Sequence, residues 1–441
     1  MKQNAPLLIL VVWCLTGWFL PVQADILIKE WNTPKKIHIL FVPDPSTDLV
    51  SVNFSFQQIG SAVDPKGKEG LAAVMMQLLF ERTVEGSDRF TLQKKLKRLG
   101  VIHGIQYDIS HDNINFWFKC PKDKLKEAFL IVKIILTEPS LDEKELAKMK
   151  NYDPAGSRLA TAGELEFAKK ILFQKVFSPH PYALPTSGTL EGRQSITIQD
   201  IQQSIQQRFV REKLVFSVTG NIDQNVLGKQ IDETFGGLPE KSPLPNIGPA
   251  PLNFDGQMTI LHKDSPQSGV EFGQPGVAYN HPDYLPLLVI NDILGGKPFT
   301  SRIWLEAREK QGLVYNIQTD LSGNQYAALL TGSFECDNQN AQTVITIIKN
   351  EWKSLKENGV NEKEFKAAKT GLMGRFVLNF TSPDGIAQYL LMCYLNGFPT
   401  NYINLRNKLL NEVTLEQVNR VAKEYLNLNQ LTFVIVGNPS Q

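Results

Sequence analysis

The chain contains segments with two different hydrophobic periods. Residues 36–44 (KIHILFVPD), 49–64 (LVSVNFSFQQIGSAVD) and 114–120 (INFWFKC) carry apolar and β-forming residues in alternation or in short clusters, which predicts strands. Residues 90–100 and 123–139 place apolar residues three and four apart and end in glycine or proline, which predicts amphipathic helices. A chain that mixes strands and helices in this way is expected to build sheets with helices packed against them.

An internal repeat divides the chain into two halves. Residues 196–221 (ITIQDIQQSIQQRFVREKLVFSVTGN) and 413–438 (VTLEQVNRVAKEYLNLNQLTFVIVGN) align without a gap. Each copy predicts a helix that starts after a threonine, then a turn and a buried strand. Residues 238–256 lie between the copies and are rich in proline and glycine, as linkers are. We therefore predict an α+β fold of two homologous domains, residues 25–237 and 257–441, joined by a linker at 238–256.

The first 24 residues differ from the rest of the chain. Lys2 precedes an apolar core at residues 7–20, and a small residue, Ala24, precedes a candidate cleavage site. This pattern is typical of a secretory signal peptide. The apolar core is shorter than the ~20 residues that a spanning helix needs. We expect cleavage after Ala24 and no stable membrane span afterwards; the alternative is a retained anchor.

Length, charge and cysteine content narrow the possible functions. A chain of 441 residues is longer than one ordinary hydrophobic core accommodates. Its formal net charge of +1 provides no global basic field that would attract nucleic acid. Cys120, Cys336 and Cys393 lie outside the signal segment, far apart and without the spacing of a zinc site. They form either one disulfide and a free thiol or three buried thiols.

The helix predicted from Gly70 to Phe80 (GLAAVMMQLLF) is almost entirely apolar. It follows a strand that ends in Gly-Ser, within the segment IGSAVDPKGKEGLAAVMMQLLF. Three further segments contribute to the same pattern: HPYALPTSGT at 180–189, ILGGKPFTSRIWLEAREKQGLVY at 293–315 and the closing VGNP. Together these segments resemble the insulinase-like metallopeptidases of family M16 over nearly the whole mature chain. The resemblance implies that both halves carry the M16 domain fold.

The resemblance also shows what this helix lacks. Family members carry H-x-x-E-H here, in which two histidines bind zinc and the glutamate activates water. In this chain Ala73 and Gln77 stand at the histidine positions, and Met76 stands at the glutamate position. Glu145 or Asp153 lies near the region of the family's downstream glutamate ligand, but one carboxylate would not hold the metal. We therefore expect no metal site and no catalytic residue in this chain.

A second feature of the family is retained. In many members the second half contributes an arginine and, seven residues later, a tyrosine, which bind substrate near the scissile bond. Here REKQGLVY supplies Arg308 and Tyr315 with that spacing. Both side chains can donate hydrogen bonds to a peptide carbonyl or to a developing oxyanion. Without the resemblance, they read as a solvated helix charge and a strand aromatic.

A chain with the Arg/Tyr pair but without zinc ligands carries only the substrate-binding part of a peptidase site of this family. Family members often divide the work between two homologous chains. Together with the predicted signal peptide, the resemblance therefore implies a secreted, periplasmic subunit that binds peptide or unfolded polypeptide. A homologous H-x-x-E-H partner would hold the zinc. The alternative is an inactive peptide-binding or scaffold protein without a protease partner. An active peptidase with other ligands would need a metal site that the sequence does not show.

Overall fold

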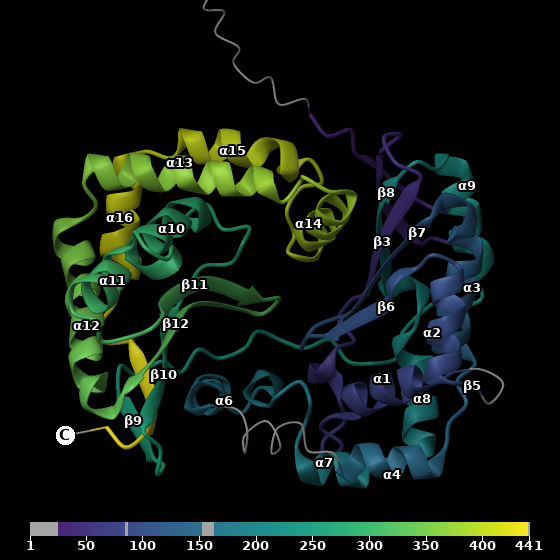
Figure 1. The fold of residues 1–441 in the computed structure, drawn as a ribbon, viewed down its shortest axis with the longest axis horizontal. Helices are drawn as coiled ribbons and strands as arrows, with labels where there is room; N and C mark the ends of the chain where they lie inside the picture. Colours follow the sequence, from purple (N-terminus) through teal and green to yellow (C-terminus); the bar gives the residue numbers. More distant parts are fainter. Residues whose placement is uncertain (1–24, 84–86, 152–162, 440–441) are drawn as a thin grey trace, which may run out of the picture.

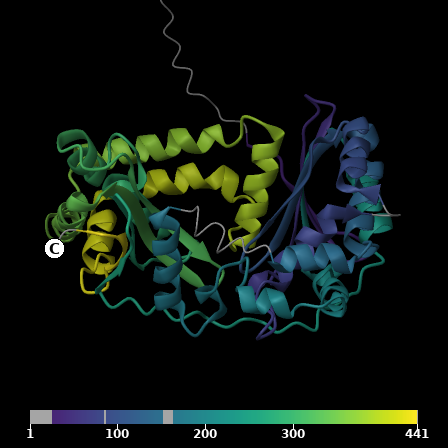
Figure 2. The same ribbon diagram turned by 60° about the horizontal axis from the view of Figure 1, so that its bottom comes forward.

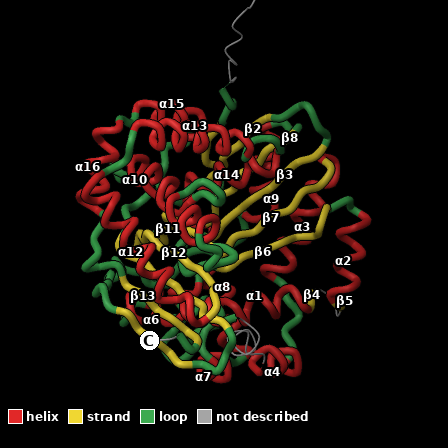
Figure 3. The backbone as a smooth tube through the Cα atoms, turned by 60° about the vertical axis from the view of Figure 1, so that its left-hand side comes forward, coloured by secondary structure: helices red, strands yellow, loops and turns green. Residues whose placement is uncertain are grey.

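The computed structural model describes residues 25–83, 87–151 and 163–439, which form two main sheets (Figure 1). The first has the strand order β1-β2-β8-β3-β7-β6 and is made of β1 (Lys29–Asn32), β2 (His38–Pro43), β3 (Leu49–Phe56), β6 (Ile102–Ile109), β7 (Ile114–Pro121) and β8 (Leu214–Gly220). The second has the order β11-β12-β10-β13-β9 and is made of β9 (Met258–His262), β10 (Gln267–Pro275), β11 (Ile317–Asn324), β12 (Ala327–Asp337) and β13 (Thr432–Gly437). A short ladder pairs β4 (Arg82–Thr83) with β5 (Ser87–Asp88). Figure 3 shows the strands of the first sheet side by side.

Helices connect the strands in both halves. The first half contains α1 (Leu71–Glu81), α2 (Arg89–Arg98), α3 (Leu125–Thr137), α4 (Glu143–Asn151), α6 (Glu164–Phe177), α7 (Leu190–Ser195), α8 (Ile198–Arg208) and α9 (Gln224–Phe235). The second half contains α10 (Tyr284–Asn291), α11 (Arg302–Trp304), α12 (Ala341–Asn358), α13 (Glu362–Leu378), α14 (Pro383–Leu395), α15 (Tyr402–Glu412) and α16 (Leu415–Tyr425). Two π-helical turns, Asp292–Gly296 and Leu305–Lys310, flank α11.

The alternation in residues 49–56 gives the first sheet two different faces. Val50, Val52, Phe54 and Phe56 are fully buried in the core under the helices of the same half, because successive side chains of a strand point to opposite faces. The intervening Ser51, Asn53 and Ser55 lie on the opposite face, which is turned toward the second half. One face of β3 therefore carries the core, and the other face of this strand is polar.

The two copies of the repeat fold alike, which confirms the predicted duplicated α+β architecture. Thr197 and Thr414 cap α8 and α16, each through a complete capping box. The strand that follows each helix, β8 or β13, lies between one parallel and one antiparallel neighbour. Each half thus contains one mixed sheet and one copy of the helix–strand unit.

The two halves exchange a helix. From the first half, α6 packs on β10 and β13 of the second sheet, where Ala168, Leu172 and Val176 join an apolar cluster with Val434 and Val436. From the second half, α14 packs on β3 and β8 of the first sheet, with Leu390 and Leu391 in contact with Leu40, Val42 and Val215. Both exchanged helices are visible between the sheets (Figures 1 and 2). Each sheet is therefore covered on one face by a helix from the other half.

Three further observations bear on the sequence predictions. Residues 241–257 contain neither helix nor strand and run along the surface between the sheets. Cys120, Cys336 and Cys393 are buried free thiols, which favours the second cysteine alternative, and burial raises the pKa of each to about 12. In the described part of the chain, every helix is too short or too polar to span a bilayer. Residues 1–24, which carry the predicted signal peptide, lie outside the described residues.

Candidate functional site

A buried ion pair fixes the start of α1, the helix that corresponds to the zinc-binding helix. The Asp64 carboxylate accepts hydrogen bonds from the backbone N–H groups of Gly70 and Ala72, at 2.9 and 3.0 Å. Arg208 Nη2 lies 2.5 Å from Asp64 Oδ1, and both side chains are at most 3% exposed. Arg208 also donates to the carbonyl of Gly60 at 2.6 Å. A carboxylate at a helix N-terminus satisfies unpaired N–H groups and complements the helix dipole, so the orientation of α1 is well determined.

The three degenerate motif positions lie in two different environments. Ala73 is 6% exposed, and Met76 is fully buried in the apolar core. Gln77 is partly buried, and its Oε1 accepts a hydrogen bond of 3.1 Å from Arg193 Nη2. Arg193 is itself 1% exposed, and it also donates to the carbonyl of Met149 at 2.6 Å. A buried guanidinium therefore lies against the position of the second histidine.

This arrangement does not fit a zinc ion. Zinc in proteins takes three or four nitrogen, sulfur or carboxylate ligands, whereas Ala73, Met76 and Gln77 offer one neutral amide, which already accepts from a cation. Within the described ranges, no group of three His, Cys, Asp or Glu residues could hold a metal. Glu145 on α4 lies near Gln77 but forms an ion pair with Lys148 at 2.9 Å. Asp153 lies outside the described residues.

A cavity of about 550 Å³ lies beside Gln77. Its lining comes from α1, α2, β6 and α4, so all of its described walls belong to the first half. Strand β6 is the last strand of its sheet, and its outer edge is unpaired in the described part of the chain. The burial of Arg193 leaves no signal in the local sequence. Nothing in TLEGRQSIT distinguishes a buried arginine from a solvated one, because the contacts that bury it come from distant segments.

The structure brings Arg308 and Tyr315 together in the second half. The Arg308 guanidinium carbon lies 5.2 Å from the centre of the Tyr315 ring, and Arg308 Nη1 donates to the carbonyl of Val314 at 3.0 Å. Gly312, with φ of +64°, allows the tight turn between them. Tyr315 is 85% exposed. Neither side chain lines the cavity beside Gln77.

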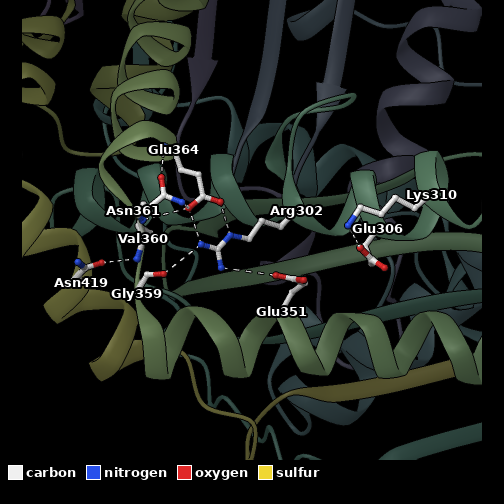
Figure 4. Close-up of polar contacts among 9 residues, drawn as sticks. All are labelled: Arg302, Glu306, Lys310, Glu351, Gly359, Val360, Asn361, Glu364 and Asn419. Atoms are coloured by element: carbon white, nitrogen blue, oxygen red, sulfur yellow. Dashed lines mark hydrogen bonds and ion pairs between the residues drawn. The ribbon is translucent and has the colours of Figure 1, made fainter.

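A separate ion-pair cluster anchors the segment that carries Arg308 (Figure 4). Arg302 binds Glu364 through two hydrogen bonds, Nε to Oε1 at 2.8 Å and Nη2 to Oε2 at 2.7 Å. Its Nη1 lies 3.8 Å from Glu351 of α12. The hydrogen bonds from Arg302 hold the pKa of the Glu364 carboxyl below its usual value. This bidentate pair connects the start of the segment to α13, so the backbone that presents Arg308 is rigid at its base.

Comparisons with known proteins show which family this chain is similar to. The model of insulinase (peptidase family M16) matches residues 38–189, and the model of the peptidase M16 inactive domain matches residues 195–372. The non-peptidase homolog YmxG of Helicobacter pylori is 25% identical over 431 residues, which cover 96% of this chain and 97% of that protein. The mitochondrial-processing peptidase subunit beta of Saccharomyces cerevisiae is 22% identical over 399 residues, 87% of this chain and 83% of that protein. The crystal structure of a peptidase M16 inactive domain from Pseudomonas fluorescens has a TM-score of 0.86 at 21% identity and covers 94% of this chain and 98% of that one. The chain therefore belongs to peptidase family M16, as an inactive homologue.

Proposed function

We propose that this chain is the non-catalytic, substrate-binding subunit of a periplasmic two-chain zinc peptidase. Its partner is a homologous chain that carries H-x-x-E-H and the zinc. The N-terminal segment, with its basic start, apolar core and Ala24, supports export. The substrate is peptide or unfolded polypeptide.

The observation that carries the proposal is the Arg308–Tyr315 pair. A phenol that is 85% exposed contributes little to the core, and a guanidinium stacked on it is held in one orientation. Such a pair is preorganised to donate hydrogen bonds to a peptide carbonyl outside its own domain. The anchoring of this segment through Arg302 further limits the reorganisation that binding requires. All these features occur in a chain whose residues Ala73, Met76 and Gln77 supply no strong zinc ligand.

The test is reconstitution with an H-x-x-E-H homologue exported by the same organism. We expect no cleavage of an unfolded polypeptide by this chain alone and chelator-sensitive cleavage by the mixture. Combining Arg308→Ala with Tyr315→Phe should lower kcat/KM about tenfold or more, the effect of losing hydrogen bonds made in the transition state. Lys310→Ala is the matched control, because Lys310 is an exposed cation on the same segment that pairs only with its neighbour Glu306 among the described residues.

Size-exclusion chromatography separates assembly from catalysis in this experiment. The double variant should form the complex as well as the unaltered chain does. Unchanged cleavage by the double variant would remove the role given to the pair. Failure to recover any peptidase complex would favour the alternative, a scaffold or peptide-binding protein without a protease partner.

A further inference from the structure

A second cavity, of about 390 Å³, lies between the two halves. Its walls come from β3, β6 and β7 of the first sheet, the tip of the β11–β12 hairpin, and α14. Figure 1 shows this hairpin pointing toward the first sheet, with α14 beside it. The Asp112 carboxylate ties the two sides together, since Oδ2 accepts a 2.8 Å hydrogen bond from the backbone N–H of Gln325. This cavity is distinct from the one beside Gln77 and shares no described residue with it.

The described lining of the cavity is polar, with acidic but no basic side chains. Its described lining contains seven side-chain amides and two carboxylates, Asp108 and Asp112, with no lysine, arginine or histidine. The next residue along this face of β7, Lys119, is not part of the lining and pairs with Asp384 of α14. Asp112 is 5% exposed, and its carboxylate already accepts hydrogen bonds from the Tyr182 hydroxyl and from the backbone N–H of Gln325. Asp108, by contrast, is exposed at the mouth.

One buried acceptor in the lining lacks a partner among the described residues. Asn53, an amide on the neighbouring strand of the same lining, is 8% exposed. Asn115 Oδ1 is buried and has no hydrogen-bond partner within the described ranges. Leaving such a group unsatisfied costs about 1–3 kcal/mol. A bound group that supplies N–H donors would remove this cost.

The strand register gathers these groups on one surface. Asn53 of β3 is directly opposite Trp117 of β7, and Asn115 is directly opposite Asp108 of β6. Trp117 is 40% exposed, so one part of its ring is open to a ligand. An exposed indole beside a carboxylate attracts a cation through both cation–π and charge–charge interactions.

We infer that this cavity binds a basic side chain of an extended polypeptide, an arginine guanidinium or a lysine ammonium. Such a group carries several N–H donors and no acceptor, which matches a lining of amide and carboxylate oxygens. Asp108 supplies the opposite charge, Trp117 the aromatic face, Asn115 the free acceptor and Asn53 a further amide oxygen. The inference rests on the proposed function in one respect: the occupant is a residue of the bound polypeptide.

The test compares two fluorescein-labelled unstructured peptides that differ at one position, arginine in one and the neutral isostere citrulline in the other. Fluorescence anisotropy with the full mature chain should show the arginine peptide binding about tenfold more tightly, the size expected for one charge-assisted contact. Asp108→Asn should lower the affinity for the arginine peptide to the affinity measured for the citrulline peptide. The affinity for the citrulline peptide should not change. Asp264→Asn is the control, because Asp264 is an exposed carboxylate outside the lining. Asn53→Ser provides a second variant that reduces the same difference from inside the cavity.

The outcomes separate the two proposals. Equal affinity for both peptides would overturn the basic-residue site and leave the proposed peptide-binding subunit intact. An arginine preference that survives both Asp108→Asn and Asn53→Ser would also overturn it, since the preference would then arise elsewhere. If neither peptide binds the chain alone, the inference is wrong, whereas reconstituted cleavage with the zinc-bearing partner would still support the proposed function.

Discussion

Restoring the three motif residues should restore only weakened zinc binding, because Arg193 lies against the site. The perturbation is Ala73→His, Met76→Glu and Gln77→His together, a triple variant that recreates H-x-x-E-H. A guanidinium donates to the side chain at position 77, so it would lie near a zinc ion bound there. Charges of +1 and +2 about 5 Å apart repel by about 7 kcal/mol at an effective dielectric of ~20. If relaxation of the surrounding structure reduces this charge repulsion to about 2 kcal/mol, the affinity for zinc still falls about 30-fold.

The assay is competition for zinc against a chromogenic chelator, with circular dichroism to verify folding. Adding Arg193→Met to the triple variant removes the charge and keeps similar bulk, so this quadruple variant should bind zinc at least 30-fold more tightly. Glu145, which lines the same cavity, is present in both variants, so it does not affect the comparison between them. Arg193→Met alone is the control and should bind no zinc. Equal zinc affinity of the triple and quadruple variants would refute the electrostatic reasoning.

Two further predictions concern stability and pH. Asp64→Asn leaves the buried Arg208 charge without its partner and should lower the free energy of unfolding by about 3–5 kcal/mol, measured by urea denaturation; a loss below ~1 kcal/mol would contradict this. Burial raises the pKa of Glu271, on β10 beneath α6, to about 8. The folded state therefore keeps a proton that the unfolded state releases near pH 4.5, and stability falls as pH rises from ~4.5 to ~8. Glu271→Gln should remove this slope and stabilise the protein at pH 8 by about 2–5 kcal/mol, measured by urea denaturation across that range; an unchanged slope would contradict the assignment.

Local patterns in the sequence were sufficient for much of the fold. Strict alternation in residues 49–56 and the gapless repeat ending at Asn221 and Asn438 specify strands, helices and the duplication, because each depends on near neighbours. The closeness of Arg308 and Tyr315 also follows from local geometry, since a helical end and Gly312 make a tight turn between them.

Other features depend on contacts between segments far apart in the chain. The burial of Arg193 requires α1 and α4, and its sequence neighbourhood gives no sign of this. The helix exchange is invisible for the same reason: amphipathic patterns in α6 and α14 predict an apolar face without saying which sheet it covers. The cavity between the halves arises where a turn near Asp112 meets a hairpin tip near Gln325, two segments separated by 213 positions.

The exchanged helices also determine the order in which the protein can be completed during synthesis. The last strand of the first sheet, β8, ends at Gly220, but α14, which covers that sheet, ends at Leu395. At ~5–20 residues per second, a ribosome needs roughly 10–35 s to make the intervening ~175 residues. During this interval Leu40, Val42 and Val215 lack their covering helix. The apolar surface of the first sheet is therefore covered only when the chain is nearly complete, because the covering helix comes from residues 383–395.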